Sequence, residues 1–212
     1  MARKEESVWN RLSSVYDFFM KKDEATYKEI IQRTTQLLKP KEHVLEIATG
    51  TGIIALGLCE HILNIEAIDF STDMIAVARK KAAQMGANSL KFDVQDACKL
   101  TYDSGSFDAV MIANALHVMP NPDMVLMEIK RVLTPEGRLI APTFVHAESL
   151  KAEALSRLMR ITGFRAYHKW TEQSYHKFLN ENSFEIVESR IFQASFPLNY
   201  VVAKPIKTDI LG

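Results

Sequence analysis

The stretch His43–Phe70 constrains the fold of this chain more than any other segment. Residues 43–48 are apolar and partly β-branched, as in a buried parallel strand. A glycine turn, Thr49–Gly52, ends this run, and residues 53–61 have the length and apolar content of a helix lying on a sheet. A second short strand then ends at Asp69. The pattern predicts a strand–turn–helix–strand unit with a ligand site, because ligands of open α/β sheets bind outside the carboxyl ends of the strands.

The glycine turn by itself leaves the identity of this ligand open. A helix that begins at such a turn presents free backbone N–H groups and the positive end of its dipole, and glycine lets a ligand approach closely. Gly50, Gly52 and Ala55 satisfy the G-x-G-x-x-G/A dinucleotide pattern, and Asp69 lies near the place expected for a ribose-binding acid. A nicotinamide or flavin site therefore fits the turn as well as other cofactors do.

The rest of the chain alternates helical and extended segments, and this alternation sets the fold class. Ser71 is a suitable helix N-cap, and Gly86 a natural stop for the same helix. We expect an α/β, Rossmann-like, doubly wound, mostly parallel seven-stranded sheet with an antiparallel C-terminal strand pair. The predicted strands are 43–48, 64–68, 89–94, 107–113, 138–144, 184–192 and 196–203, and the predicted helices include 24–38, 53–61, 72–85, 121–134, 146–161 and 171–182.

Length and segment order predict one domain, 1–212, built of four parts. With 212 residues and 47% hydrophobic side chains, the chain can bury one good core. Residues 1–42 carry two helices that either pack on the sheet or cover the ligand as a lid, and residues 43–145 form the ligand-binding core. Residues 146–182 are expected to set substrate specificity, and residues 183–212 hold the C-terminal antiparallel strands.

Charge and composition exclude several classes of function. The 26 basic and 26 acidic residues balance, so nucleic acid is not an expected partner. No apolar signal core or membrane-length apolar run occurs, which predicts a cytoplasmic protein without stable membrane insertion. Cys59 and Cys98 show no metal-binding or CxxC spacing, and we expect no metal site. A monomer or a homodimer is expected.

Two acids narrow the choice of ligand. Glu46 lies inside the first strand, where a buried carboxylate costs several kcal/mol unless a cation or strong donors compensate it. A pyrophosphate would be repelled there, whereas a ligand that carries an ammonium group would be attracted. Asp96 follows the third strand, where it can accept a hydrogen bond from an exocyclic amine. The chain also ends in two strands rather than in a second dinucleotide-binding half.

Together these segments resemble the class I S-adenosylmethionine-dependent methyltransferases, in the small-molecule branch that includes quinone-biosynthesis and phospholipid methyltransferases. The resemblance spans about residues 43–145. In one departure, Ala48 stands where the first motif usually has a glycine, and we expect modest crowding there and no loss of binding. The matching segments are Glu46–Gly52, Ile68–Ile75, Asp96-Ala97, Phe107–Val110, Asn114–His117 and Leu133–Leu139.

The resemblance implies S-adenosylmethionine as cofactor, S-adenosylhomocysteine as product, and a role for each matching residue. Glu46 would anchor the ammonium of the methionine part, and Asp69 would accept both ribose hydroxyls. Asp96 would accept the adenine amine, while Asn114 would contact the methionine part through its backbone. Tyr16 resembles an N-terminal tyrosine of this branch that reaches over the cofactor. The full implied set of cofactor-binding residues is Tyr16, Glu46, Ala48, Gly50, Thr51, Gly52, Asp69, Phe70, Met74, Asp96, Ala97 and Asn114.

The acceptor side carries weaker signals. His117 follows the fourth strand, where it is either a catalytic base or donor, or a packed histidine. His146, Tyr167, His168 and Trp170 are candidate substrate contacts, because they lie in or beside the expected specificity segment. Apolar residues in that segment favour a small aromatic or apolar acceptor over a highly charged one.

Two other functions compete with methyl transfer. The glycine pattern is also that of an NAD(P)-dependent oxidoreductase of the Rossmann type. The lack of an obvious base leaves room for a protein that binds S-adenosylmethionine without transferring its methyl group.

Overall fold

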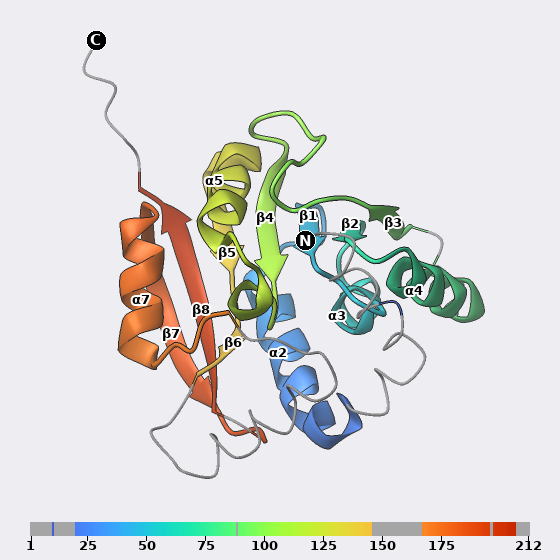
Figure 1. Ribbon diagram of the computed structural model, residues 1–212. Coiled ribbons are helices and arrows are strands. Elements are labelled where there is room, and N and C mark those ends of the chain that lie inside the picture. Colours follow the sequence, from blue (N-terminus) through green and yellow to red (C-terminus); the bar gives the residue numbers. More distant parts are fainter. Residues whose placement is uncertain (1–9, 11–19, 88, 146–166, 196, 207–212) are drawn as a thin grey trace.

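The computed structural model describes residues 10, 20–87, 89–145, 167–195 and 197–206, which form a mixed sheet with helices on both faces (Figure 1). The helices are α2 (Glu24–Leu37), α3 (Ile53–Leu58), α4 (Thr72–Met85), α5 (Pro122–Val132) and α7 (Glu172–Glu181), with short 3-10 turns η1 (Lys21–Asp23) and η2 (Leu116–Val118). The strands are β1 (His43–Ile47), β2 (Asn64–Asp69), β3 (Lys91–Val94), β4 (Phe107–Ile112), β5 (Leu133–Ile140), β6 (Thr143–Phe144), β7 (Phe184–Phe192) and β8 (Leu198–Pro205).

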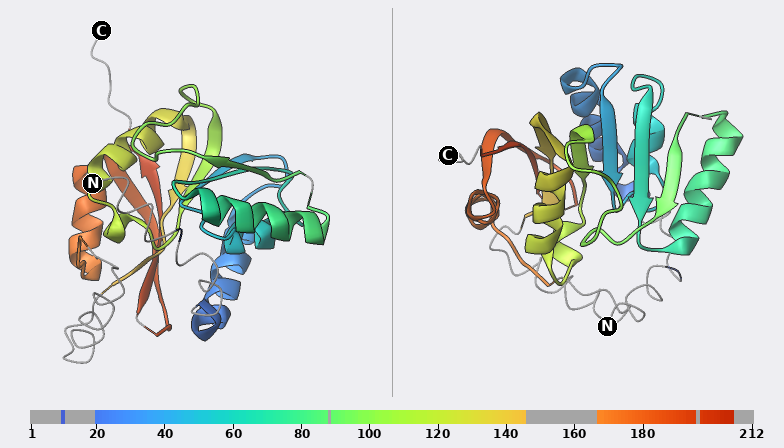
Figure 2. Two further views of the ribbon diagram at one scale, coloured as in Figure 1. Left: turned by 45° about the vertical axis from the view of Figure 1, so that its right-hand side comes forward. Right: turned by 90° about the horizontal axis from the view of Figure 1, so that it is seen from above.

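The strand order confirms the predicted doubly wound fold. Strands β3, β2, β1, β4 and β5 are neighbours in that order and all parallel, so their carboxyl ends meet at one edge of the sheet. Strand β8 runs antiparallel beside β5 and β6, and β7 pairs with its other side. Figure 2 shows β7, β8 and α7 at the opposite end of the sheet from β3 and α4.

The sheet has eight strands rather than seven, because the predicted strand 138–144 is interrupted at Pro142. Proline has no N–H to donate to the ladder. Both halves still pair with β8: Ile140 lies opposite Val202, and Thr143 lies opposite Asn199. The short strand β6 is therefore a continuation of β5 beyond a break.

Two apolar layers hold the helices on the sheet. One layer joins α2, α3 and α4 to one face, and the other joins α5 and α7 to the opposite face. Strand β1 serves both layers, since Val44 belongs to the first and Leu45 and Ile47 to the second. This two-sided burial is the reason why the strand reads as a nearly continuous apolar run.

Several predicted boundaries needed correction. The helix after the glycine turn ends at Leu58, three residues earlier than expected, and β3 begins at Lys91 rather than at Ser89. The predicted helix 121–134 ends at Val132, and β5 already begins at the next residue. The pairing with β4 passes from Leu133 to Arg138, so the residues between them form a bulge instead of a turn before the strand.

The caps of α4 formed as predicted. The Ser71 hydroxyl accepts a hydrogen bond from the N–H of Met74, and Gly86 ends the helix with φ 69°. Of the two helices expected in residues 1–42, α2 packs on the sheet, with Ile30 fully buried and Tyr27 7% exposed. The first predicted helix lies outside the described residues apart from Asn10. Within the described ranges, no helix has the length and apolar content needed to cross a membrane.

Candidate functional site

The glycine turn lies at the carboxyl edge of β1 and is held in a left-handed backbone conformation. Ala48, Gly50 and Gly52 have φ values of 56°, 57° and 80°. The Thr49 N–H donates to the Ile68 carbonyl (2.9 Å), which fixes the turn against β2. Positive φ costs little for glycine but is unfavourable for alanine. The main cost of having alanine rather than glycine at position 48 is therefore backbone strain, not crowding by the methyl group.

The Asp69 carboxylate accepts hydrogen bonds from the glycine turn and from the start of α4. Its Oδ2 accepts a hydrogen bond from the Gly50 N–H (2.8 Å), and its Oδ1 accepts one from the Ser71 N–H (2.9 Å). Burial raises the pKa of Asp69, and these backbone donors oppose the rise. A carboxylate oxygen has room for more than one donor, so both oxygens can still receive ligand hydroxyls.

Glu46 is the second acid at the turn, and it is 3% exposed. Its Oε2 accepts hydrogen bonds from the Thr49 hydroxyl (2.7 Å) and from the Ala55 N–H in the first turn of α3 (3.0 Å). Its Oε1 accepts none from the described residues. Burial raises the pKa of Glu46 to about 7, against the effect of these two donors, and the nearby charge of Asp69 adds to the rise.

These contacts set the charge that the turn prefers in a ligand. In a phosphate-binding loop the backbone N–H groups face the ligand. Here the Gly50 N–H is directed to Asp69, and a second carboxylate lies behind the turn. A pyrophosphate would meet two acids at this position, whereas a cationic group would be attracted by both.

Gly52 is needed for packing as well as for its φ angle. A Cβ at this position would lie 3.2 Å from Cβ of Ala78 and 3.2 Å from a ring carbon of Phe92. The glycine thus lets the start of α3 approach α4 and β3 closely. The sequence argument gave Gly52 only a ligand-facing role.

The other predicted cofactor residues lie along the same edge. Phe70 is half-buried at the end of β2, and Met74 is 1% exposed in the first turn of α4. Asp96 is exposed beyond β3, where its Oδ1 accepts a hydrogen bond from the Cys98 N–H (2.9 Å). Ala97 is half-buried, and Thr51 is fully buried. Tyr16 lies outside the described residues.

The carboxyl end of β4 presents Asn114 and His117. Asn114 adopts φ 51°, and its N–H donates to the Pro142 carbonyl (2.8 Å). His117 lies on η2, and its Nδ1 is 3.3 Å from the hydroxyl of Thr143, which is 1% exposed. Sequence reasoning missed Thr143, which lies just beyond the carboxyl end of β5, the parallel neighbour of β4.

The predicted substrate residues Tyr167 and His168 come together with His117. Their backbone N–H groups both donate to the His117 carbonyl, at 2.9 and 3.1 Å. The His168 ring stacks on Trp170, with centroids 5.1 Å apart, and Trp170 stacks in turn on Phe178. Trp170 is only 8% exposed, and its side chain belongs to the core beneath α7. His146 lies outside the described residues.

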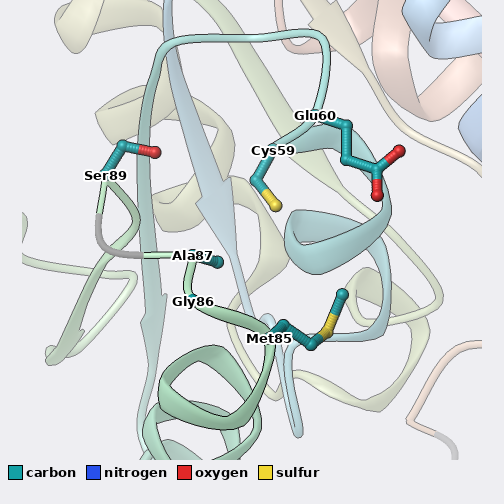
Figure 3. Close-up of a pocket in the computed structure, with 6 residues that line it drawn as sticks. All are labelled: Cys59, Glu60, Met85, Gly86, Ala87 and Ser89. Carbon is teal, nitrogen blue, oxygen red and sulfur yellow. The ribbon is translucent and has the colours of Figure 1, made fainter.

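A separate cavity of about 320 Å³ contains none of the predicted site residues. Cys59, Glu60, Met85, Gly86, Ala87 and Ser89 line it (Figure 3). Cys59 and Gly86 cap the carboxyl ends of α3 and α4, whereas the glycine turn and Ser71 lie at the amino ends of these helices. The cavity is therefore at the far side of the unit from the predicted ligand. Among the described side chains, no group of three or more His, Cys, Asp or Glu could hold a metal ion.

Comparison with known proteins finds curated relatives that match about half of the chain. The chain is 39% identical over 110 residues to a demethylmenaquinone methyltransferase of Thermus thermophilus, covering 51% of this chain and 50% of that protein. It is 36% identical over 98 residues to a phosphatidylethanolamine N-methyltransferase of Cereibacter sphaeroides, covering 46% and 48%. The chain thus spans about half the length of these curated relatives.

Solved structures share the fold. An S-adenosylmethionine-dependent methyltransferase of Methanosarcina mazei superposes with a TM-score of 0.69 at 23% identity, covering 80% of this chain and 95% of that one. The family model described as a methyltransferase domain matches residues 38–183, well over half of the chain. The chain therefore belongs to the methyltransferase domain family, as its motifs predicted.

Proposed function

We propose that this chain binds S-adenosylmethionine at the glycine turn and transfers its methyl group to a small aromatic or apolar acceptor. The observation that carries the proposal is the pair of acids at the turn. Glu46 has an oxygen that accepts nothing from the described residues, and Asp69 already binds the Gly50 N–H. This arrangement favours a cationic amino-acid group and a ribose over a pyrophosphate.

In methyl transfer the protein itself forms no covalent bond with the substrate. The bound cofactor supplies a methyl group that is already activated as a sulfonium, so the chain's own residues need to align the acceptor and exclude water. His117 would bind the acceptor or remove its proton through Nε2, since Nδ1 faces Thr143. The segment that begins at Tyr167 would form one wall of the acceptor site, because it is tied to the His117 carbonyl.

The names of the relatives indicate two acceptor classes, a quinone ring and a phospholipid headgroup. The half-buried His168 ring, which the buried Trp170 ring supports from below, favours the aromatic acceptor. Flat rings of this kind provide a large apolar contact at low entropic cost. We therefore propose a reduced quinone or related phenolic ring as the acceptor.

The cofactor proposal is tested by calorimetry with S-adenosylhomocysteine and NADH. We expect S-adenosylhomocysteine to bind and NADH to bind far more weakly. Tight binding of NADH without a response to S-adenosylhomocysteine would overturn the proposal in favour of a Rossmann-type oxidoreductase.

The acceptor proposal is tested with labelled S-adenosylmethionine and two acceptor sets, soluble naphthohydroquinones and vesicles that contain phosphatidylethanolamine. We expect label in the hydroquinones. Transfer only to the vesicles would replace the aromatic acceptor by a lipid. Binding of the cofactor without transfer to any acceptor would favour a non-catalytic binding protein.

A further inference from the structure

The side chain of Asn114 has an unusual environment at the edge of the ligand site. Asn114 follows β4 directly after Ala113, and β4 is the neighbour of β1, with Ile112 opposite Ile47. Asn114 and the glycine turn therefore extend from adjacent strand ends. Its φ of 51° is held by the bond from its N–H to the Pro142 carbonyl. A strained backbone of this kind persists only where the surrounding structure fixes it.

Tyr27 of α2 fixes which way the Asn114 amide points. The Tyr27 hydroxyl is positioned to donate its one proton to the Met20 sulfur (3.4 Å). Its oxygen is then an acceptor, and it receives a hydrogen bond from the Asn114 Nδ2 (3.2 Å). The amide nitrogen thus faces α2, and the Asn114 Oδ1 faces away from it.

The Asn114 Oδ1 is buried and has no hydrogen-bond partner among the described residues. Leaving a buried acceptor unpaired is costly, so such an atom in a ligand site indicates a donor that the ligand supplies. The ammonium of an amino acid has several protons and can satisfy both this oxygen and a carboxylate. Glu46, on the adjacent strand β1, offers that carboxylate.

We propose that the Asn114 Oδ1 accepts a hydrogen bond from the ammonium of the bound cofactor, and that Tyr27 is the positioning residue that holds the amide in this orientation. This inference rests on the proposed function and adds a side-chain contact to the backbone contact expected from the motif. Through Tyr27, helix α2 then takes part in cofactor binding, although the sequence analysis assigns the cofactor to residues 43–145.

The test compares two tyrosine-to-phenylalanine variants by calorimetry. Tyr27→Phe removes only the hydroxyl that orients Asn114. Tyr200→Phe is the matched control, because the buried Tyr200 hydroxyl also binds a residue of α2, Thr34 (3.1 Å). Thermal denaturation of both variants measures the loss of stability that the two changes share.

The probes are S-adenosylhomocysteine and 5′-methylthioadenosine, which lacks the amino-acid group. For Tyr27→Phe we expect about 10- to 100-fold weaker binding of S-adenosylhomocysteine, the usual worth of one hydrogen bond to a charged group, and an unchanged affinity for 5′-methylthioadenosine. Asn114→Ala should lose at least as much, and the double variant no more than Asn114→Ala. Tyr200→Phe should bind both probes as the wild type does.

Three results would overturn the inference: an unchanged S-adenosylhomocysteine affinity in Tyr27→Phe, an equal loss for both probes, or additive losses in the double variant. If Tyr27→Phe does not fold, the selectivity of Asn114→Ala between the two probes decides in the same way. A wild-type protein that binds neither probe would instead overturn the proposed function itself, so the two failures are distinguishable.

Discussion

The turn between β1 and α3 and the edge beyond β4 both carry residues of the predicted cofactor site, but their polar groups are satisfied to different degrees. At the turn, Asp69 accepts two backbone N–H groups, and Glu46 accepts a hydroxyl and an N–H. Beyond β4, the Asn114 Oδ1 and the His168 Nε2 are buried without a partner among the described residues. We call the turn, with Glu46 and Asp69, the built side, because its acids already have hydrogen-bond donors. We call the edge beyond β4, with Asn114 and His168, the unfinished side, because a ligand could supply the partners that these two atoms lack.

This difference matters for how each side responds to mutation. A satisfied network stabilises the fold, so removing one partner leaves another buried group unpaired and costs stability. A buried unpaired group already costs stability, so removing it should not destabilise the fold, and its loss should affect binding instead. The four variants below test this contrast, from the largest expected effect to the smallest.

Glu46→Gln tests the cost of the buried charge. Burial raises the pKa of Glu46 in the folded state to about 7, from an ordinary value of 4.5, so the folded state binds more protons than the unfolded state between these values. The free energy of unfolding of the ligand-free protein should therefore fall as pH rises from about 4.5 to 7, by about 3 kcal/mol from this group. Asp69, whose pKa is also raised, adds a change of the same sign.

Urea denaturation at several pH values measures this slope. In Glu46→Gln the Glu46 share of the slope should disappear, and the variant should be more stable than the wild type above pH 7. Glu185→Gln, at an exposed position of β7, is the control and should keep the wild-type slope. A wild-type slope in Glu46→Gln would mean that this carboxyl is ionised throughout.

Asp69→Ala tests the built side through binding. The change removes the acceptor of two backbone N–H groups and of the predicted ribose hydroxyls. S-adenosylhomocysteine affinity should fall by at least about 1.5 kcal/mol, the range for a charge-assisted hydrogen bond. Asp93→Ala, at an exposed position of β3, should bind as the wild type does. Equal affinity of Asp69→Ala and wild type would remove Asp69 from the site.

Ala48→Gly tests the strain in the turn. At φ 56° glycine relieves the left-handed penalty of alanine, so the free energy of unfolding should rise by about 1 kcal/mol. Ala76→Gly, at an exposed position of helix α4, should lower it by about the same amount. If Ala48→Gly destabilises the protein as Ala76→Gly does, the turn has another conformation than the one described.

His168→Phe tests the unfinished side. Phenylalanine can keep the stacking on Trp170 while removing the unpaired Nε2, so the free energy of unfolding should change by less than about 1 kcal/mol. The Michaelis constant for the acceptor should rise, with cofactor affinity unchanged. A loss of stability well above about 1 kcal/mol would show that His168 is as firmly integrated as the acids of the turn.

The built side was largely predictable from the sequence, and the unfinished side was not. Glu46, the glycine turn and Asp69 lie within one strand–turn–helix–strand unit, so their proximity follows from local pattern and the parallel pairing of β1 with β2. The bonds of Tyr27 to Asn114 and of Thr143 to His117 join elements that only the complete sheet brings together. A single sequence contains no periodicity or spacing that signals such contacts.

Local errors also had physical causes. Pro135 and Gly137 follow the predicted helix 121–134 and are residue types that end helices, but they lie in a bulge of β5, where a missing N–H and a missing side chain are equally acceptable. Pro142 divided one predicted strand into two, because it cannot donate to the ladder. The first break was expected and only its nature was wrong, whereas Pro142 was expected inside a continuous strand.

The central claim is that the acids of the turn receive a cationic group, and proton release on binding tests it most directly. S-adenosylhomocysteine is titrated calorimetrically at pH 7 in two buffers of different ionisation enthalpy. Because Glu46 is half protonated at this pH and its charged form is favoured by an ammonium, roughly half a proton should be released per ligand bound. This release should be absent in Glu46→Gln. Binding without proton release in the wild type, or with equal release in both proteins, would contradict the claim.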